Sequence, residues 1–567
     1  MKTKVFKINE AQLFFFILIF STTQLNAQWA MARSFGVDGN NEYITDVGLD
    51  AQDNMYVVGR YSDEDPQYDF DGQPLLNLPT VFGSNQGLVW AKYDASNVLQ
   101  FVKSYRAMKD TNEASQITNP SMAVAPGGEV VLAGTYRHSV EIEGQSLTAT
   151  QTGFAESNMF VAKFDNSGTL SWLKNVDTYG ASCLDLSFDN NGDVILAGSF
   201  KQAINFGNSI SHSGSSSRTW GYLCRLAGSD GVAQALEIFD GGYPTNIDIN
   251  SAGEIALLGE FKKDQIDFSD NTTLYLKTPI TSSNLKLNYF IARFSSALSP
   301  VWIKQVRGNA MGIADINHMG SDIKVMLNNN MSYLAIDNDS IDGDAHVVAT
   351  MDFATGNVKS IAEGNNILYG MASNATGTFL STSRGSLNTF AFGSFSTPMP
   401  DEFILFEIDQ MDTVQWYESI NFSTFGYLRT DVMTASSSDL LMGGKVYATG
   451  VVDFSSTVSI TPTGGLYNDG WFARYSLGAV VSLEEQSKVE LSLYPNPVTN
   501  YLTIANLPEE VEDVKIEIRE VSGRLCRVYT LEDANSKIPT ADLTPGVYFL
   551  GLQLEGVGLE NIRFIKK

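Results

Sequence analysis

Five polar side chains stand at matching positions in a repeated strand, and their side-chain oxygen atoms could bind a cation or a polar ligand. Aligning the copies of this strand on a glycine in the strand that follows gives Asp46, Ser121, Asp185, Asn246 and Asp431. If the copies surround a common axis, these side chains converge on it and form a polar site. The alternative is that small polar residues there only line a water-filled channel.

Calcium binding would need closely spaced carboxylates, and three acidic stretches of the sequence have that composition. They are DEDPQYDFDG (63–72), FDNNGD (188–193) and DNDSIDGD (337–344). Calcium takes about six to eight oxygen ligands, but none of these stretches contains a complete EF-hand loop with its closing Glu. The first also aligns with VEIEG (140–144), which indicates a repeated strand and turn. We therefore predict no obligatory cofactor, and calcium is the metal to test.

Signatures of common hydrolases are missing from the sequence. The chain has four histidines, His138, His212, His318 and His346, and lacks HExxH, GxSxG and a phosphate-binding glycine-rich loop with its lysine. No residue is therefore predicted to be catalytic. An active site assembled from separate repeats would nevertheless leave no local motif.

The scaffold that would position the five polar residues is a four-part repeat. Its glycine-bearing strand reads DNMYVVGRY (53–61), GEVVLAGTY (128–136), GDVILAGSF (192–200) and GEIALLGEF (253–261). A short strand precedes it, an alternating strand such as FVAKFD (160–165) follows, and a strand opening with an aromatic residue comes last. Weaker copies bring the total to seven. The copies recur about every 64 residues, longer than the roughly 40–45 residues of a WD-type repeat.

The two ends of the repeat region predict how the copies are arranged. The seventh copy ends at WFARYSLG (471–478) without an aromatic-led fourth strand, whereas the chain after residue 28 begins with one, WAMARSFG (29–36). We predict that this first strand hydrogen-bonds beside residues 471–477. Seven four-stranded sheets would then close into a β-propeller, which leaves only short, protected edges. An open solenoid would instead need polar capping units at both ends.

Glycines and small residues within the repeat carry two further predictions. Gly59, Gly134, Gly198, Gly259 and Gly444 should mark places where backbones approach too closely for a side chain. Copies five and six have Leu327 and Ser383 at this position. Gly, Ser and Thr-rich stretches such as SHSGSSSRT (211–219) are predicted to be loops.

Composition excludes some classes of partner. The 567-residue chain has a formal net charge of −27, so it lacks the clustered Lys and Arg that nucleic acid or an anionic membrane surface requires. Three cysteines, Cys183, Cys224 and Cys526, are scattered and odd in number, so no disulfide framework is predicted.

Residues 1–27 have the pattern of a cleaved secretory signal. Lys2, Lys4 and Lys7 precede the apolar run LFFFILIF (13–20), and the segment ends in Ala27. The run is shorter than the about 20 apolar residues that cross a membrane, so no integral membrane segment is expected in the mature chain. Cleavage removes three lysines and one glutamate and takes the formal charge to −29.

The C-terminal segment has a different pattern from the repeats. After a short polar linker (479–488), residues 489–567 contain alternating strands such as VKIEI (514–518), which predict a small Ig-like β-sandwich of about 80 residues. The repeat region itself is assigned to residues 28–478.

Residues 489–567 also resemble the type A C-terminal sorting domain of the type IX secretion system of Bacteroidota. The motifs are YPNP, VSGR, LTPGVYFL and the terminal FIKK, with the key residues Tyr494, Pro495, Asn496, Pro497, Gly523, Gly546, Tyr548 and Lys566. Cys526 stands where an aliphatic residue is usual. The resemblance implies passage through the periplasm and outer membrane, by way of the type IX machinery, to the cell surface or the medium. The repeats similarly resemble Bacteroidota propellers built on a GNVYVAGxF strand, most of which lack an assigned activity.

These observations predict a secreted or cell-surface β-propeller that binds an extracellular protein or glycan through loops at one mouth. One alternative is an extracellular hydrolase or lyase with an active site assembled from several repeats at the channel mouth. Another is a passive structural component of the cell surface.

Overall fold

The structure is a computed structural model of the 567-residue chain. It describes residues 28–36, 41–62, 69–75, 86–108, 116–150, 157–215, 219–261, 265–268, 273–275, 288–337, 339–342, 346–383, 389–398, 403–422, 426–463, 467–477, 492–505, 514–520, 524–531, 537–554 and 558–567. The expected signal segment and the whole of the expected linker, residues 479–488, lie outside these residues. The regular elements of the described residues are all β-strands, and no helix among them could span a membrane.

The chain divides into two compact parts, residues 1–479 and 480–567. The larger part contains seven repeats of four antiparallel strands within the described residues. Repeats 1 to 3 are formed in order by β2 (Tyr43–Leu49), β3 (Met55–Tyr61), β6 (Gly87–Tyr93) and β7 (Leu99–Met108); β8 (Ile117–Val124), β9 (Val130–Tyr136), β12 (Asn158–Phe164) and the first half of β13 (Leu170–Phe188); and the second half of β13, β14 (Val194–Asn205), β16 (Thr219–Leu226) and β17 (Ala233–Asp240).

The remaining repeats follow the same strand order. They are formed by β18 (Gly242–Ile249), β19 (Ile255–Phe261), β22 (Asn288–Phe294) and the first half of β23 (Pro300–Met319); the second half of β23, β24 (Asp322–Ile336), β26 (His346–Asp352) and β27 (Val358–Gly364); β28 (Leu368–Ser373), β29 (Thr378–Ser383), β32 (Phe403–Ile408) and β33 (Val414–Phe422); and β34 (Gly426–Ala435), β35 (Asp439–Ala448), β38 (Asp469–Ser476) and β1 (Gln28–Phe35).

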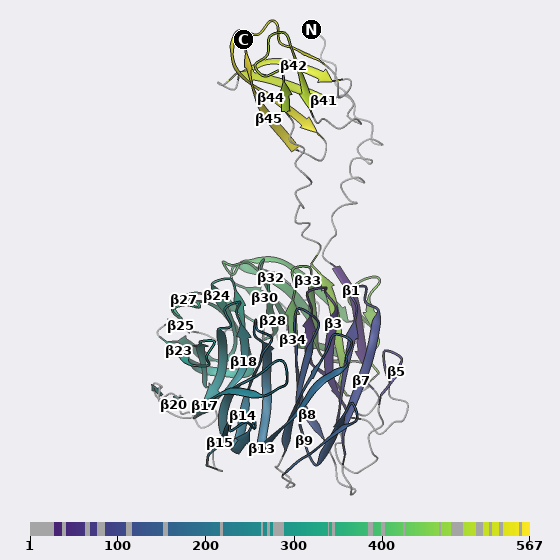
Figure 1. The fold of residues 1–567 in the computed structure, drawn as a ribbon, viewed down its shortest axis with the longest axis vertical. Coiled ribbons are helices and arrows are strands. Elements are labelled where there is room, and N and C mark those ends of the chain that lie inside the picture. Colours follow the sequence, from purple (N-terminus) through teal and green to yellow (C-terminus); the bar gives the residue numbers. More distant parts are fainter. Residues whose placement is uncertain are drawn as a thin grey trace. The chain divides into compact units, whose positions relative to one another are not determined.

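The first strand of the chain completes the last repeat. β1 pairs antiparallel with β38, with Trp29 opposite Tyr475 and Phe35 opposite Gly470. In Figure 1 the purple β1 lies among the green strands from the end of the repeat region. The strand pairing that the two ends of the sequence predict is therefore present.

Neighbouring repeats pack through their first strands and through hydrophobic clusters. β2 contacts β8, and the contacts continue in order through β13, β18, β23, β28 and β34, which in turn contacts β2. Each neighbouring pair of repeats shares a buried cluster. Repeats 7 and 1 also share one, which includes Phe472 and Ile44. The apolar faces of each four-stranded sheet are thus covered by its neighbours, which is the main favourable term in folding.

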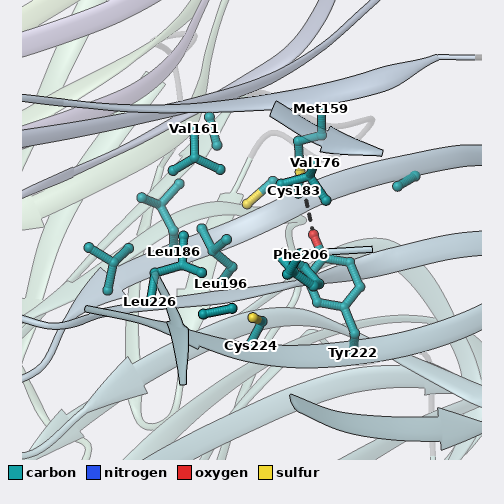
Figure 2. Packing of buried hydrophobic residues seen from close by; sticks show 14 of the residues in the cluster. Met159, Val161, Val176, Cys183, Leu186, Leu196, Phe206, Tyr222, Cys224 and Leu226 are labelled. Atoms are coloured by element: carbon teal, nitrogen blue, oxygen red, sulfur yellow. Dashed lines mark hydrogen bonds between the residues drawn. The ribbon is translucent and has the colours of Figure 1, made fainter. Parts of the chain in front are cut away.

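The cluster between repeats 2 and 3 illustrates this packing. Figure 2 shows Met159 of β12 facing Tyr222 of β16, whose hydroxyl lies 3.5 Å from the Met159 sulfur. Cys183 and Cys224 are buried in the same cluster as free thiols. Burial raises the pKa of both thiols, which keeps them protonated and unreactive.

Short edge strands extend most of the sheets. β10 pairs with β7, β20 with β17, β30 with β27 and β36 with β33, so a hairpin of one repeat covers the outer edge of the repeat before it. The edge strands are β4 (Asp69–Phe70), β5 (Gln73–Pro74), β10 (Ser139–Ile142), β11 (Gln145–Thr148), β15 (Ser211–Ser213), β20 (Gln265–Phe268), β21 (Thr273–Tyr275), β25 (Asp339–Asp342), β30 (Thr389–Phe392), β31 (Phe395–Pro398), β36 (Val452–Asp453) and β37 (Ser459–Ile460).

The prediction that residues 211–219 form a loop is wrong at their start. Ser211–Ser213 form β15, which pairs with the end of β14. Polar composition indicated a loop, but the unpaired backbone groups of a sheet edge favour added strands whatever their side chains.

The repeated glycines lie opposite a bulge in the first strand of their repeat. A Cβ added to Gly59, Gly198 or Gly444 would lie 2.5, 2.0 or 2.2 Å from a carbonyl oxygen of that strand. For Gly259 the nearest backbone atom is the Tyr243 oxygen at 2.7 Å. The prediction of close backbone approach is confirmed at these four positions and wrong at Gly134, where the obstacle is the Phe160 ring at 2.9 Å.

The C-terminal part contains two antiparallel sheets. They are β39 (Ser492–Tyr494), β40 (Tyr501–Ala505) and β43 (Ile538–Pro539), and β42 (Leu525–Leu531), β41 (Val514–Glu520), β44 (Gly546–Leu554) and β45 (Gly558–Lys566). Leu502 of one sheet and Ile518 and Phe564 of the other belong to one buried cluster. The two sheets therefore share a core.

Candidate functional site

A polar cavity of about 410 Å³ lies where the first strands of the repeats meet. Residues of repeats 1, 2, 3, 4, 5 and 7 line it. All five of the polar residues predicted to converge line this cavity: Asp46, Ser121, Asp185, Asn246 and Asp431. The structure therefore brings them to one place, and we call it the axial cavity.

The strand register refines this set. Asp46 lies opposite Val58, and Asp185 lies opposite Ala197, in each case the residue before the marker glycine. Ser121 and Asn246 have the same register in repeats 2 and 4. These four residues are equivalent, as the alignment indicated.

Repeats 5 and 7 depart from the alignment. In repeat 5 the equivalent residue is Asp315, opposite Met326, which the sequence analysis missed because Leu327 replaces the marker glycine. In repeat 7 Val432 has the equivalent register, opposite Gly443, and Asp431 is the extra residue of the bulge. The predicted equivalence of Asp431 with Asp46 is therefore wrong by one residue, because the turn between the first two strands is one residue shorter in repeat 7, where Ala435 pairs with Leu440, than in repeat 1, where Leu49 pairs with Met55.

Two of the axial carboxylates fasten neighbouring repeats together. Asp46 accepts hydrogen bonds from the backbone N–H groups of Val47 and of Met122 in repeat 2, both at 2.8 Å. Asp185 does the same with Leu186 and with Ile247 in repeat 4, both at 2.7 Å. A structural role thus accounts for the oxygens of these two side chains.

The Asp315 carboxyl group makes fewer hydrogen bonds to the backbone than those of Asp46 and Asp185 do. Its Oδ1 accepts a hydrogen bond from the Ile316 N–H at 2.8 Å, and the Asn246 amide lies 3.5 Å from the same oxygen. Within the described residues its Oδ2 has no hydrogen-bond partner. Because Asp315 lines the axial cavity, this oxygen is available to a ligand or to water.

Burial shifts the titration of the axial carboxyl groups. It raises the pKa of Asp46 to about 6 and that of Asp315 to about 7, and raises the pKa of Asp185 well above its usual range. Nearby carboxylates add to the increase for Asp185 and Asp315. Near neutral pH the cavity therefore contains carboxyl groups that can donate as well as accept hydrogen bonds.

The geometry does not assemble a metal site among the described residues. No group of three or more His, Cys, Asp or Glu side chains there is placed to hold a metal ion. In FDNNGD (188–193), Asp189 accepts hydrogen bonds from the N–H groups of Asn191 and Asp193, which is a turn. Residues 63–68, 338 and 343–344 of the other two acidic stretches lie outside the described residues.

The predicted sorting residues lie in the C-terminal part. The Asn496 side chain accepts a hydrogen bond from Ile565 N–H at 2.9 Å and donates one to the Arg563 carbonyl at 3.2 Å, so it holds the last strand, β45. Tyr494 is exposed at the end of β39, and Pro495 and Pro497 follow it. Gly546 begins β44, buried Tyr548 donates to the Thr544 carbonyl at 2.9 Å, and Lys566 ends β45. Gly523 lies outside the described residues.

A family model described as the secretion system C-terminal sorting domain matches residues 492–565. The protein is exported by type IX secretion. Its destination is the cell surface or the medium, and its sorting domain implies interaction with the secretion machinery. The match supports a secreted protein of Bacteroidota.

Solved structures resemble the chain only distantly, and no curated protein matches its sequence. Hydrazine synthase of Kuenenia stuttgartiensis is 8% identical with a TM-score of 0.37, over 70% of this chain and 92% of that one. A protein of unknown function from Dyadobacter fermentans is 9% identical with a TM-score of 0.35, over 79% and 99%. PorZ of Porphyromonas gingivalis, a surface component of its type IX secretion system, is 9% identical with a TM-score of 0.15, over 96% and 100%. At these scores the similarities carry no conclusion about function.

Proposed function

We propose that residues 28–478 form a seven-bladed β-propeller that serves as an extracellular binding protein. Residues 1–27 are its signal peptide, 479–488 a linker, and 489–567 an Ig-like sorting domain. The pairing of β1 with β38, the contact between β34 and β2 and the shared cluster of repeats 7 and 1 support circular closure. Four-stranded repeats that close in this way leave no exposed end.

A recurring hydrogen bond between repeats supports the same arrangement. A basic residue in the third strand donates to the backbone carbonyl of a turn in the next repeat: Lys92 to Asn166 at 2.7 Å, Lys163 to Gly228 at 3.0 Å, and Arg293 to Ala354 at 3.1 Å. Arg474 of repeat 7 makes the equivalent bond to Ala95 of repeat 1 at 2.9 Å. Repeat 7 therefore makes with repeat 1 the same hydrogen bond that other repeats make with the next repeat along the chain.

The axial cavity carries the proposal of binding. It is concave, it is lined by polar groups from six repeats, and its carboxyl groups both donate and accept hydrogen bonds near neutral pH. Such a site suits a hydroxyl-rich or peptide ligand, so the proposed ligand is an extracellular glycan or protein. Export to the cell exterior places the site where such ligands are found.

The test is a binding screen of the purified mature protein against glycans and surface proteins, followed by a variant that fills the cavity. Leu184 lines the axial cavity and is 37% exposed, so Leu184→Arg should block ligand entry without disturbing the core. Val301→Arg is the matched control, because Val301 is exposed and is not among the residues lining the cavity. Loss of a saturable ligand in Leu184→Arg alone supports the proposal. A ligand that binds both variants equally, or no saturable ligand at all, contradicts it and favours a passive surface component.

A hydrolase or lyase is the second candidate, and Asp315 is the observation that favours it. A carboxyl group with a pKa of about 7 and an oxygen open to a cavity has the properties of a general acid. Turnover of any glycan or peptide by the mature protein, abolished in Asp315→Asn, would establish this candidate over simple binding.

A further inference from the structure

We propose that a second cavity, between repeats 7 and 1, binds the carboxylate or sulfate group of an acidic saccharide. The cavity has a volume of about 370 Å³ and is lined by Tyr43, Arg60, Asp431 and Lys445, with Asn119 and Pro120 of repeat 2. We call it the seam cavity. The inference rests on the proposed binding function and names the chemistry of the ligand.

The charges at the seam cavity oppose those of the rest of the chain. Arg60 and Lys445 line the cavity, and Arg429 lies directly opposite Lys445 in the pairing of β34 with β35. Asp431 is the acidic residue among them, and its Oδ1 lies 2.6 Å from the Arg429 Nε. Three cations against one carboxylate leave a local excess of positive charge in a protein whose net charge is −27. The electrostatic potential of these cations attracts an anion from a distance, in addition to the direct ion pairs that it forms once bound.

The arrangement of these cations costs stability. Like charges directly opposite each other on neighbouring strands are unfavourable, and Arg429 and Lys445 are such a pair. Lys445 is half-buried and has no hydrogen bond or ion pair to a described residue. Burial and the charges of Arg429 and Arg60 lower its pKa, while Asp431 opposes that shift. A bound oxyanion would reduce the repulsion between Arg429 and Lys445. It would also give the Lys445 ammonium a hydrogen-bond acceptor.

Aromatic rings lie near the cations. The Tyr43 ring already contacts two of them, so the exposed Tyr427, which lies outside the cavity lining, is the surface on which we expect a sugar ring to pack. The Arg60 guanidinium lies 4.4 Å and the Lys445 ammonium 5.2 Å from the centre of the Tyr43 ring. Farther along the same pair of strands, Tyr427 and Tyr447 lie opposite each other with ring centres 5.7 Å apart, and Tyr427 is 38% exposed. Flat aromatic surfaces pack against the apolar faces of sugar rings, whereas a free phosphate or sulfate ion has no apolar face that could pack against them.

The experiment titrates the purified mature protein with three probes in low salt by calorimetry. The probes are trigalacturonic acid, which carries carboxylates, its methyl ester, which does not, and a chondroitin sulfate oligosaccharide, which carries sulfates in addition to carboxylates. We expect at least one acidic probe to bind at least 10-fold more tightly than the neutral ester. Raising the salt concentration should weaken that binding.

Variants locate the binding at the seam cavity. Lys445→Gln and Arg60→Gln should each lower the affinity about 10-fold, and Asp431→Asn should raise it, because it removes the one negative charge at the site. Lys359→Gln is the control, because Lys359 pairs with Asp322 and Asp352 on repeat 5. Lys445→Gln removes a repulsion, so its folding is not at risk and lost binding cannot be attributed to unfolding.

Several results would overturn the inference. Equal binding of the methyl ester, tighter binding of a polyglutamate peptide, or no binding of either acidic probe at millimolar concentration would each do so. Weaker binding by Asp431→Asn would also overturn it. The Asp431 carboxylate would then accept a hydrogen bond from the ligand, as proposed for the carboxyl groups of the axial cavity. A ligand lost in Leu184→Arg but unaffected by Lys445→Gln would leave the proposed function standing and remove the seam cavity.

Discussion

The seam between repeats 7 and 1 and the matching level of repeats 2 and 3 share a backbone but not a chemistry. One residue beyond the marker glycine, repeat 2 pairs Thr118 with Thr135, with hydroxyls 2.6 Å apart, and repeat 3 pairs Ser182 with Ser199, with hydroxyls 3.1 Å apart. The register-equivalent pairs at the seam are Tyr43 with Arg60 and Arg429 with Lys445. Repeat 4 has an acidic residue at this level, since Tyr243 pairs with Glu260. Among these pairs the cations occur at the seam, and their mutual repulsion favours a bound anion there.

The largest expected effect tests whether β1 is held in repeat 7 as firmly as strands elsewhere are held in their own repeats. Trp29 of β1 is 5% exposed and packs edge-on against Phe454 and Tyr475. Trp29→Ala should lower the free energy of unfolding by about 3–5 kcal/mol, as expected for a buried Trp. Trp172→Ala between repeats 2 and 3 should cost a similar amount. Urea unfolding measures both, and a cost of less than about 1 kcal/mol for Trp29→Ala would show that β1 is dispensable.

A smaller effect distinguishes the ion pairs within repeats 7 and 2 by their burial. Arg474 donates to Asp439, at 2.9 Å through Nε and 2.5 Å through Nη2, and both side chains are buried. Arg474→Ala leaves Asp439 buried without its counter-charge and should cost about 3 kcal/mol. Lys163→Ala between repeats 2 and 3 should cost about 1 kcal/mol, because the side chain of its partner Glu129 is 48% exposed. The double variant Arg474→Ala/Asp439→Ala should recover part of the loss. Equal costs for the two single variants would contradict the distinction.

Asp315 tests the axial cavity through the pH dependence of stability. Its folded pKa of about 7 lies above the ordinary 3.8, so the folded state binds the proton more tightly and unfolding becomes easier as the pH rises from about 4 to 7. Asp315→Asn keeps the bond from Ile316 and removes the buried charge. It should be more stable than the natural protein by about 4 kcal/mol at pH 8 and no different at pH 3.

Thermal unfolding across this pH range, with the exposed Asp453→Asn as control, makes the measurement. A variant that is less stable at pH 8 would mean that the Asp315 carboxylate is held by an interaction that the cavity geometry does not reveal.

The smallest effect concerns the charged pair itself. Lys445→Gln removes a like charge opposite Arg429 and should raise the free energy of unfolding by about 0.5 kcal/mol at low ionic strength, and by less at high salt. Lys359→Gln removes a cation from two favourable pairs and should change stability in the opposite direction. A loss of stability in Lys445→Gln would mean that Lys445 serves the fold.

The sequence predicted the repeats better than the site. The strand pattern at the two ends of the repeat region identified the pairing of β1 with β38. The seventh repeat lacks an aromatic-led fourth strand, and a strand of that type precedes the first repeat. Aligning on glycine identified Asp46 and Asp185, since the bulge opposite that glycine is a backbone requirement. The same method missed Asp315, where Leu327 occupies the marker position, and misplaced Asp431, because the turn between the first two strands is one residue shorter in repeat 7.

The seam cavity could not be predicted from the sequence, for a different reason. Arg60 and Lys445 are separated by most of the repeat region and line one cavity where repeats 7 and 1 pack together. Each is an ordinary charged residue in an alternating strand when read alone. Likewise, the start of the polar stretch 211–219 was mistaken for a loop, because β15 pairs with β14 through backbone groups and its side chains carry no strand pattern.

The pairing of β1 with β38 is the central claim, and a cross-link tests it most directly. Gln28 and Ser476 are partners in the ladder, so Gln28→Cys/Ser476→Cys in a Cys526→Ser background should form a disulfide on mild oxidation. The account predicts near-complete cross-linking and a gain of about 4 kcal/mol in stability, because the bond joins the two ends of the repeat region. Two thiols that stay free under oxidation, or a cross-linked protein less stable than its reduced form, would contradict it.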